Sequence, residues 1–414
     1  MRAMKDSVVE WIGEIPQEWD TVRAKYVVVI TNGADPKTEG DTPVYGSGNG
    51  CFKTCGESKE GPAVLLGRKG TVDNPQFVEG KYWNVDTAFD VKTIGSKINL
   101  YYFYLLSKCF DYKYYTATTT LPSMTQTNYG NMYLPYPSID IQEQIIAFLD
   151  TKCAEIDALI AAKERTNALL KERRQSIIYE AVTKGLDPTA PMKDSGVEWI
   201  GEIPEGWSVC RIKNLIDKFH PYPVGDGDHG MIKADDYQDE GIPYIRVLNL
   251  TWGTGLKLDN LVYISEEMND RIKNSELRPN DILIAKTGAT IGKTTIVPES
   301  LPLSNTTSHV GKITISPEYD AKYFFYVMTS FVVQRQIVDL SSMQSTRPEL
   351  GIDGLKNLIV TFPPVETQKD ISQNLDCRCD ELDSMIRATE DVVETLKEYR
   401  QSLIYEAVTG KVEV

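Results

Sequence analysis

The sequence predicts a mixed α/β protein in which two globular domains are separated by an antiparallel coiled coil of two long helices. Three observations lead to this prediction. A twelve-residue segment near the start recurs 188 residues later, two helix-like stretches 226 residues apart end almost identically, and the segments between them carry short β-like runs. The repetition also predicts pseudo-two-fold symmetry and a circular arrangement, with the C-terminus returning near the N-terminus.

The duplication is clearest at the start of each half. Lys5-Asp-Ser-Val-Val-Glu-Trp-Ile-Gly-Glu-Ile-Pro16 recurs as Lys193-Asp-Ser-Gly-Val-Glu-Trp-Ile-Gly-Glu-Ile-Pro204, with eleven of twelve residues identical. The middle segments diverge, and the second is 38 residues longer, which is the difference between the two offsets. This contrast indicates that the framework was kept while the parts that contact a target were free to differ.

Each middle segment is expected to form a mixed α/β domain, because short runs of β-forming residues alternate with Gly, Pro and Asn. Nothing in the spacing of these runs suggests a doubly wound parallel sheet. The expected strands are 26–30, 63–66 and 89–94 in the first copy and 244–247, 281–285 and 294–297 in the second, and the expected helices are 100–107 and 321–338.

Two long helices are predicted over residues 142–183 and 368–409, because apolar residues recur in alternating steps of three and four. A single stripe of this kind would favour a helix packed on a globular core, but two long copies favour a coiled coil. Both copies carry an arginine on the seam, Arg174 and Arg400. The apolar seam residues are Ile146, Leu149, Cys153, Ile156, Ile160, Leu170, Ile177 and Ala181, and Leu375, Cys379, Leu382, Ile386, Val393, Leu396, Leu403 and Ala407.

The helix ends carry recognisable signals. Capping-box-like starts are expected at Asp140 and Thr367, and the helices are expected to end at Gly185 and Gly410. The first helix leaves one domain and enters the other, so the second must return antiparallel to it, and each should span roughly 60 Å. The predicted parts are domain one (1–139), spacer helix one (140–185), domain two (186–365) and spacer helix two (366–414).

Composition limits the function classes. A chain of 414 residues is too long for a single core. It contains no run of about 18 apolar residues and begins with no signal-peptide pattern, so a soluble cytoplasmic protein without membrane contact is expected. The seven cysteines are thinly spread and are expected to be reduced. Cys51 and Cys55 lack a second pair and the three histidines are scattered, so no metal site is expected.

The net charge of −15 argues against a nucleic-acid partner. The acidic surplus, however, lies almost wholly in the second half of the chain, and the first half is nearly neutral. An acidic protein can still hold DNA if its basic residues gather on one face, or if a partner supplies the positive field.

Two apparent catalytic motifs are incomplete. Gly288-Ala-Thr-Ile-Gly-Lys-Thr294 resembles a phosphate-binding loop but has three residues between its glycines where four are needed, so a strand-turn-strand is expected. Asn74-Pro-Gln-Phe77 is one residue from the Asn-Pro-Pro-Phe/Tyr motif of amino-group methyltransferases, but the chain lacks a glycine-rich loop for the methyl donor. We therefore predict no catalytic residue and no cofactor site in this chain.

Polar turns with basic residues beside glycine are the better candidates. Leu66-Gly-Arg-Lys-Gly-Thr71 and Ile284-Ala-Lys-Thr-Gly-Ala289 occupy corresponding places, and hydroxyl-rich loops precede each long helix at 118–123 and 344–349. A single such loop could be a solvated turn, but recurrence in both copies favours contact with phosphates or base edges. The candidate DNA-binding residues are Arg68, Lys69, Thr71, Thr118, Thr119, Thr120, Lys286, Thr287, Lys293, Ser345, Thr346 and Arg347.

Together these motifs resemble the DNA specificity subunit of type I restriction-modification systems. The resemblance rests on the repeated Trp199-Ile-Gly-Glu-Ile-Pro204, on Tyr45-Gly-Ser-Gly48 and the two basic turns, and on a proline followed by glutamine (Gln142, Gln368) before each long helix. It implies two target recognition domains that each read one half of a split double-stranded DNA sequence, with helices that set the gap, at most about 18 base pairs for a spacer of this length.

The resemblance further implies a bacterial or archaeal subunit that is inactive alone and serves phage defence. Two modification subunits with bound S-adenosylmethionine would dock on it to methylate adenine, and restriction subunits could join them. Three alternatives stay open: a methyltransferase-only or type IIB-like system, an adenine methyltransferase formed by this chain itself, and a protein-only scaffold, which the acidic charge would favour.

Overall fold

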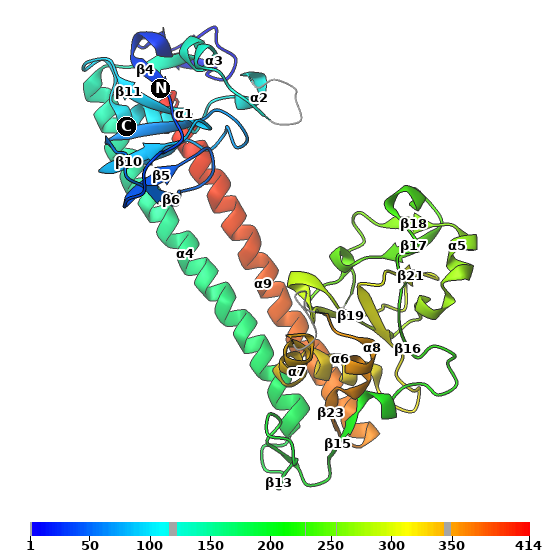
Figure 1. Ribbon diagram of the computed structural model, residues 1–414. Helices are drawn as coiled ribbons and strands as arrows, with labels where there is room; N and C mark the ends of the chain where they lie inside the picture. Colours follow the sequence, from blue (N-terminus) through cyan, green and yellow to red (C-terminus); the bar gives the residue numbers. More distant parts are fainter. Residues whose placement is uncertain (1, 116–121, 228, 254, 343–348) are drawn as a thin grey trace. The chain divides into compact units, whose positions relative to one another are not determined.

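The computed structural model describes residues 2–115, 122–227, 229–253, 255–342 and 349–414. The chain divides into two compact units, one formed by Met1–Arg165 with Thr389–Val414 and the other by Thr166–Ala388 (Figure 1). Each unit has its own large hydrophobic core. Among the described residues, no helix is both long enough and apolar enough to cross a membrane.

The two predicted long helices are present as α4 (Ile139–Lys184) and α9 (Val365–Val408). Each unit contains one end of both helices. In the first unit Arg400 of α9 pairs with Asp157 of α4, and Lys397 pairs with Glu164. Going from Asp157 to Glu164 along α4 corresponds to going from Arg400 back to Lys397 along α9, so the two helices run in opposite directions. The predicted antiparallel pairing is therefore confirmed in the first unit.

The predicted seam is largely buried, as knobs of a helix pair should be. Leu149, Cys153 and Ile156 of α4 share the first unit's core with Leu403 and Ala407 of α9. Ile177 and Ala181 share the second unit's core with Leu375 and Cys379. The coiled-coil prediction from the three-and-four spacing is thus confirmed within each unit.

The helix ends are confirmed, but the residues predicted to cap the helix starts are wrong. Gly185 and Gly410 follow the helices with φ of 76° and 73°, the left-handed conformation that glycine adopts most readily. Asp140 and Thr367 lie inside their helices rather than at the caps. The first turns are held instead by buried glutamine amides, because Gln142 donates to the Pro137 carbonyl (2.9 Å) and Gln368 to the Pro363 carbonyl (2.8 Å).

The first unit is built on antiparallel sheets with one parallel pair. Its central sheet has the order β4 (Val28–Asn32), β11 (Ala88–Thr93), β8 (Ala63–Gly67), β9 (Gln76–Val78). A second sheet has the order β6 (Cys51–Cys55), β5 (Thr42–Tyr45), β10 (Lys81–Asn84), β7 (Lys59–Glu60), with β5 and β10 parallel. The remaining elements are the pairs β1 (Met4–Asp6) with β2 (Glu14–Pro16) and β3 (Asp20–Arg23) with β12 (Tyr133–Tyr136), the helices α1 (Leu100–Ser107), α2 (Tyr112–Tyr115) and α3 (Gln126–Asn131), and the short helix η1 (Ala24–Tyr26).

The second unit repeats this topology. Its central sheet has the order β16 (Val224–Asp226), β22 (Val310–Ile313), β19 (Ile282–Ala285), β20 (Thr294–Ile296), and its second sheet has the order β18 (Val262–Ile264), β17 (Ile242–Ile245), β21 (Asn305–Thr306), with β17 and β21 parallel. The other elements are β13 (Met192–Asp194) with β14 (Glu202–Pro204), β15 (Ser208–Arg211) with β23 (Ile359–Phe362), the helices α5 (Glu266–Arg271), α6 (Ala321–Thr329), α7 (Phe331–Ser342) and α8 (Ile352–Asn357), and five short helices, η2 (Ile212–Asn214), η3 (Ala234–Asp236), η4 (Val247–Asn249), η5 (Lys273–Ser275) and η6 (Gly288–Thr290).

The predicted strands and helices are confirmed with three adjustments. The strand expected over 244–247 lies at Ile242–Ile245, and Val247 begins the short helix η4. The strand expected from residue 26 begins at Val28, because residues 24–26 form η1. The helix expected over 321–338 is broken at Ser330, whose backbone is extended (ψ 153°) and whose hydroxyl donates to the Val327 carbonyl. A serine hydroxyl that bonds to nearby backbone competes with helix continuation. The expected mixed α/β class is confirmed in both units.

Candidate nucleic-acid interface

The two predicted basic turns follow equivalent strands. In the first unit Gly67 at the end of β8 pairs with Ala88 of β11. In the second, Ala285 at the end of β19 pairs with Val310 of β22. The next residues are therefore structural equivalents, so Arg68 corresponds to Lys286. By the same register Lys69 corresponds to Thr287. This correspondence pairs a lysine with a threonine, so the residue types alone do not indicate it.

The structure brings each basic turn to the loop that precedes the long helix. Met124 donates its backbone N–H to the Arg68 carbonyl (2.9 Å), and Lys69 forms a bridge with Ser123. In the second unit Leu350 donates to the Lys286 carbonyl (2.9 Å), and Thr287 forms a bridge with Glu349. Two pairs of motifs that the sequence matched separately therefore form one composite site per unit. Six candidates lie outside the described residues: Thr118, Thr119, Thr120, Ser345, Thr346 and Arg347.

In the first unit the basic turn faces solvent. Lys69 and Thr71 are exposed, and the Arg68 guanidinium is partly exposed, 3.5 Å from the Asp86 carboxylate. Arg68 also donates to the Asp86 carbonyl (3.2 Å). The turn needs glycine at Gly67, since a Cβ there would lie 2.3 Å from the Thr71 carbonyl oxygen. The turn can therefore present cationic groups and backbone to a phosphate or a base edge.

A second polar loop lies beside this turn. Residues 46–50 are held by Gln76, whose amide donates to the Gly46 carbonyl (2.8 Å) and accepts from the Gly50 N–H (3.0 Å). Asn74 donates to the exposed Asn49 (2.5 Å). Side-chain amides of this kind can pair with adenine in the major groove. Sequence reasoning missed Asn49, Asn74 and Gln76 as site residues, although the false methyltransferase motif had placed two of them in one turn.

In the second unit Lys286, a predicted DNA-binding residue, is buried. Its side chain is 3 % exposed, and its ammonium is paired with the Asp226 carboxylate and lies 3.9 Å from Glu349. Lys286 is buried because the residues next to it on the sheet differ from those next to Arg68. A Cβ on Gly311 would lie 3.1 Å from Lys286 Cδ, so the lysine stem lies over that glycine.

The equivalent positions in the first unit explain why Arg68 does not do the same. In the first unit Asn32 of β4 faces Phe89 of β11. At the equivalent positions of the second unit, Asp226 of β16 faces Gly311 of β22. Phe89 fills the space that Gly311 leaves open, and Asn32 offers no carboxylate. The two turns therefore share a backbone but differ in the charge they expose.

The other candidates of the second unit are placed around its turn. Thr287 is half-buried, with its hydroxyl 3.0 Å from His309 Nδ1. Lys293 is half-buried, and desolvation, followed by the nearby Lys257 charge, lowers the pKa of its ammonium. The motif that resembles a phosphate-binding loop forms the short helix η6 and then strand β20, so the predicted strand-turn-strand is confirmed in outline.

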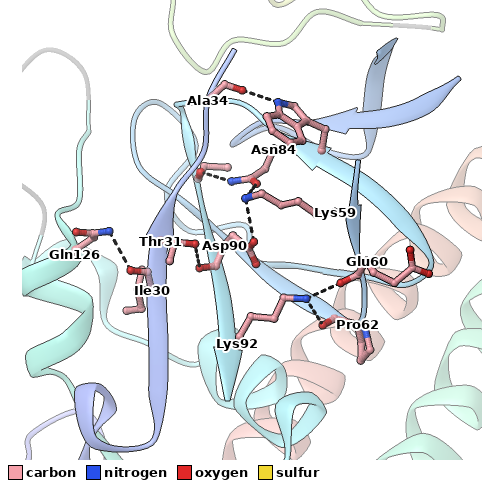
Figure 2. Close-up of polar contacts among 12 residues, drawn as sticks. Ile30, Thr31, Ala34, Lys59, Glu60, Pro62, Asn84, Asp90, Lys92 and Gln126 are labelled. Carbon is pink, nitrogen blue, oxygen red and sulfur yellow. Dashed lines mark hydrogen bonds and ion pairs between the residues drawn. The ribbon is translucent and has the colours of Figure 1, made fainter. Parts of the chain in front are cut away.

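A polar network fixes the sheet behind the turn in the first unit. Figure 2 shows Lys59 of β7 donating to Asn84 (2.7 Å) and to Asp90 (3.0 Å), which ties both sheets together. Lys92 donates to the Glu60 carbonyl (2.6 Å) on the same side. Because Asp90 is almost fully buried, its charge requires such a partner.

The second unit has a cation at the equivalent sheet position. Asp90 faces Leu65, and the corresponding Leu283 faces Lys312. Lys312 donates to the Glu276 carbonyl, and desolvation lowers its pKa while Asp281 opposes that shift. Buried charges of opposite sign thus support the same sheet in the two units.

Comparisons with known proteins agree with this geometry. A family model described as the type I restriction modification DNA specificity domain matches residues 16–170 and again residues 204–394. The chain is 29% identical over 302 residues to the type I restriction enzyme EcoBI specificity subunit of Escherichia coli, covering 72% of this chain and 62% of that protein, which is under two thirds of its length.

Two further matches span nearly the whole chain. The type I restriction enzyme MjaIX specificity subunit of Methanocaldococcus jannaschii is 23% identical over 441 residues, covering 97% of this chain and 95% of that protein. A solved structure, reported as the structural basis underlying complex assembly and conformational transition of the type I R-M system, has a TM-score of 0.68 at 15% identity and covers 96% of this chain and 99% of that one. The likeness to this solved structure supports the fold described above.

Proposed function

Because the chain belongs to the family of type I restriction modification DNA specificity domains, we propose that it reads a split DNA sequence, with one half recognised by each unit. The observation that carries this proposal is the composite site of turn and loop, which is built twice with the same backbone bonds. The side chains on that common backbone differ between the units. A shared scaffold with different contact residues is what recognition of two unlike half-sites requires.

The first unit's turn supplies the clearest DNA-contacting groups. Lys69 is exposed, and its ammonium can donate to a phosphate or to the O6 and N7 acceptors of guanine. Arg68 can exchange its partly exposed contact with Asp86 for a nucleic-acid partner. Asn49 and Asn74 beside the turn add amide groups of the type that reads adenine.

The second unit must read its half-site with less exposed charge at the turn. Lys286 is neutralised by Asp226, so Thr287, Lys293 and the loop at 344–349 are the candidates for direct contact. Hydroxyl groups can both donate to and accept from base edges. We propose that the acidic chain relies on its partner subunits for part of the positive field that DNA binding needs.

The partners in this proposal are two modification subunits, which bind S-adenosylmethionine and methylate adenine, with restriction subunits joining the complex in the cytoplasm. This chain contributes the reading of the sequence and no catalytic group. The helices α4 and α9 would set the gap between the half-sites. Inserting one turn, about four residues, into α4 should then change that gap or abolish activity, whereas a purely structural helix would lose only stability.

Exchange of one recognition domain tests the proposal. Replacing residues 20–136 with the corresponding segment of another family member should change one half of the methylated sequence and leave the other half unchanged. Methylated adenines in DNA treated with the assembled complex give the readout. A change in both halves would contradict the assignment of one half-site to each unit.

A further inference from the structure

The basic turns of the two composite sites match residue by residue, because the same hydrogen bonds recur around them. Arg68 donates its N–H to the Thr87 carbonyl (2.7 Å), and Lys286 donates its N–H to the His309 carbonyl (2.8 Å). The side chains of Arg68 and Lys286 also donate alike, to the carbonyl of the residue before Thr87 (3.2 Å) and before His309 (3.4 Å). Thr87 and His309 therefore occupy equivalent positions.

At two of these equivalent positions the units exchange a cationic side chain and a hydroxyl. The first unit has Lys69 on the turn and Thr87 immediately before β11. The second unit has Thr287 on the turn and His309 immediately before β22. Each unit thus holds one hydroxyl and one side chain that can carry positive charge on the same two backbone positions, in opposite order.

The His309 ring is placed as a surface contact residue. His309 is exposed, and its Nδ1 lies 3.0 Å from the Thr287 hydroxyl oxygen. This hydrogen bond engages one ring nitrogen and leaves Nε2 for an acceptor outside the chain. Because a protonated imidazole donates from both nitrogens, the charged ring can keep its bond to Thr287 while Nε2 donates to DNA.

The other two histidines of the chain have different partners. All three histidines lie in the second unit. His220 is buried, and its Nδ1 accepts from the Tyr222 N–H (2.9 Å). His229 is exposed, with its Nε2 3.2 Å from the Asp226 carboxylate. His309 differs from His229 because its ring is held by a neutral hydroxyl, so its charge would not be neutralised by the group that holds it.

The charged groups around His309 belong to the same composite site. Lys286 is paired with the Asp226 carboxylate and lies 3.9 Å from the Glu349 carboxylate. Asp226 is shared with His229. The buried lysine is thus already matched by acidic groups, so a protonated His309 is the group that can present positive charge to DNA from this turn.

We infer, resting on the proposed function, that His309 is the second unit's counterpart of Lys69 and contacts the DNA of the second half-site through its protonated ring. A phosphate oxygen or the O6 and N7 atoms of guanine can accept from such a donor. Histidine changes its charge between about pH 5 and 8, whereas lysine and arginine stay charged over that range. DNA binds the charged form, so the affinity of the second unit should rise as the pH falls through this range.

DNA binding at two pH values tests this inference. Fluorescence anisotropy measures binding of the assembled complex to a duplex with its split sequence, at pH 6 and pH 8 and fixed ionic strength. His309→Asn keeps an atom that can pair with Thr287 but removes Nε2, so it should weaken binding by at least about fivefold at pH 6 and by less at pH 8. Lys69→Ala should weaken binding by the same factor at both pH values. The matched control His220→Asn keeps an acceptor for the Tyr222 N–H and should retain the wild-type ratio of the two dissociation constants.

A double variant reverses the exchange between the units. Thr287→Lys combined with His309→Thr gives the second unit the order of side chains found in the first. This variant should bind at pH 8 about as tightly as the wild type binds at pH 6, and its affinity should depend little on pH. Thermal denaturation of each variant at both pH values checks that the fold is kept.

A duplex with an altered second half-site locates the acceptor. If the His309→Asn effect vanishes on this duplex, the acceptor is a base edge, and if the effect persists, the acceptor is a phosphate. A His309→Asn complex with the wild-type ratio of dissociation constants would overturn the inference and leave the proposed function standing, as would a double variant with the wild-type pH dependence. A wild-type complex that prefers no split sequence at either pH would contradict the proposed function itself.

Discussion

Two equivalent arginine-aspartate pairs in the helices offer a prediction with an internal control. Arg174 pairs with Asp383 in the second unit, and Arg400 pairs with Asp157 in the first, each with Nε to Oδ1 at 2.8 Å. The arginines are repeat equivalents, as are the aspartates. Their environments differ, because the Arg174 side chain is 7% exposed and the Arg400 side chain is 28% exposed.

The difference in burial sets the expected magnitudes. Removing one partner of a fully buried pair costs about 3–5 kcal/mol, whereas an exposed pair contributes about 0–1 kcal/mol. Asp383 keeps a quarter of its surface exposed and can be partly rehydrated, so Arg174→Met should cost about 2–3 kcal/mol. Arg400→Met should cost less than about 1 kcal/mol, because Asp157 is half exposed.

Hydrogen exchange resolves the two sites within one molecule. Two-state unfolding is not expected for a chain of two units, but exchange in peptides from residues 170–184 and 396–408 reports the local opening free energy. Arg174→Met should speed exchange in the first peptide by roughly thirtyfold or more, and Arg400→Met should speed it in the second by under about fivefold. Equal effects, or a larger effect of Arg400→Met, would refute the argument from burial.

Further predictions concern two lysines, one valine and the cysteines. Lys69→Ala should weaken DNA binding of the assembled enzyme and lower the slope of log binding constant against log salt concentration by about 1, as a salt-dependent titration can measure. Lys286→Met should instead lower folding stability, because it leaves Asp226 unpaired, and thermal denaturation measures that loss. Val8 has φ of 61° and a 90% exposed side chain where the other copy has glycine, so Val8→Gly should stabilise the first unit by about 1 kcal/mol, and a lower melting temperature would contradict this. Burial raises the pKa of the thiols of Cys109, Cys210 and Cys379 to about 12, 11 and 11, so these thiols should stay protonated at pH 8 and resist iodoacetamide. The exposed Cys51 and Cys377 should react, and peptide mass spectrometry can measure the difference.

The sequence predicted the parts of the fold that depend on local pattern and repetition. The spacing of apolar residues located α4 and α9, and the glycines after them located their ends. The capping residues were predicted wrongly, because Asp140 and Thr367 lie inside the helices. Buried Gln142 and Gln368 hold the first turns, and the Ser138 hydroxyl accepts from the Ile141 N–H. The same glutamines also accept from the distant backbone N–H groups of Asn99 and Asp320, and these tertiary hydrogen bonds leave no local signal in the sequence.

The site could be predicted only in part, for the same reason. Matching turns and loops were visible as motifs, but their pairing depends on backbone bonds between distant segments. The burial of Lys286 depends on Gly311 and Asp226, which are distant in sequence and lie on neighbouring strands. A basic residue beside glycine indicates a candidate contact, while the residues across the sheet decide whether its charge reaches the surface.

The most direct test of the account is a map of the adenines methylated by the complex assembled from this chain and modification subunits. Reading by two separate units predicts a split motif, with two specified half-sites separated by a gap of fixed length and unspecified sequence. A single uninterrupted motif, or methylation without sequence preference, would contradict it.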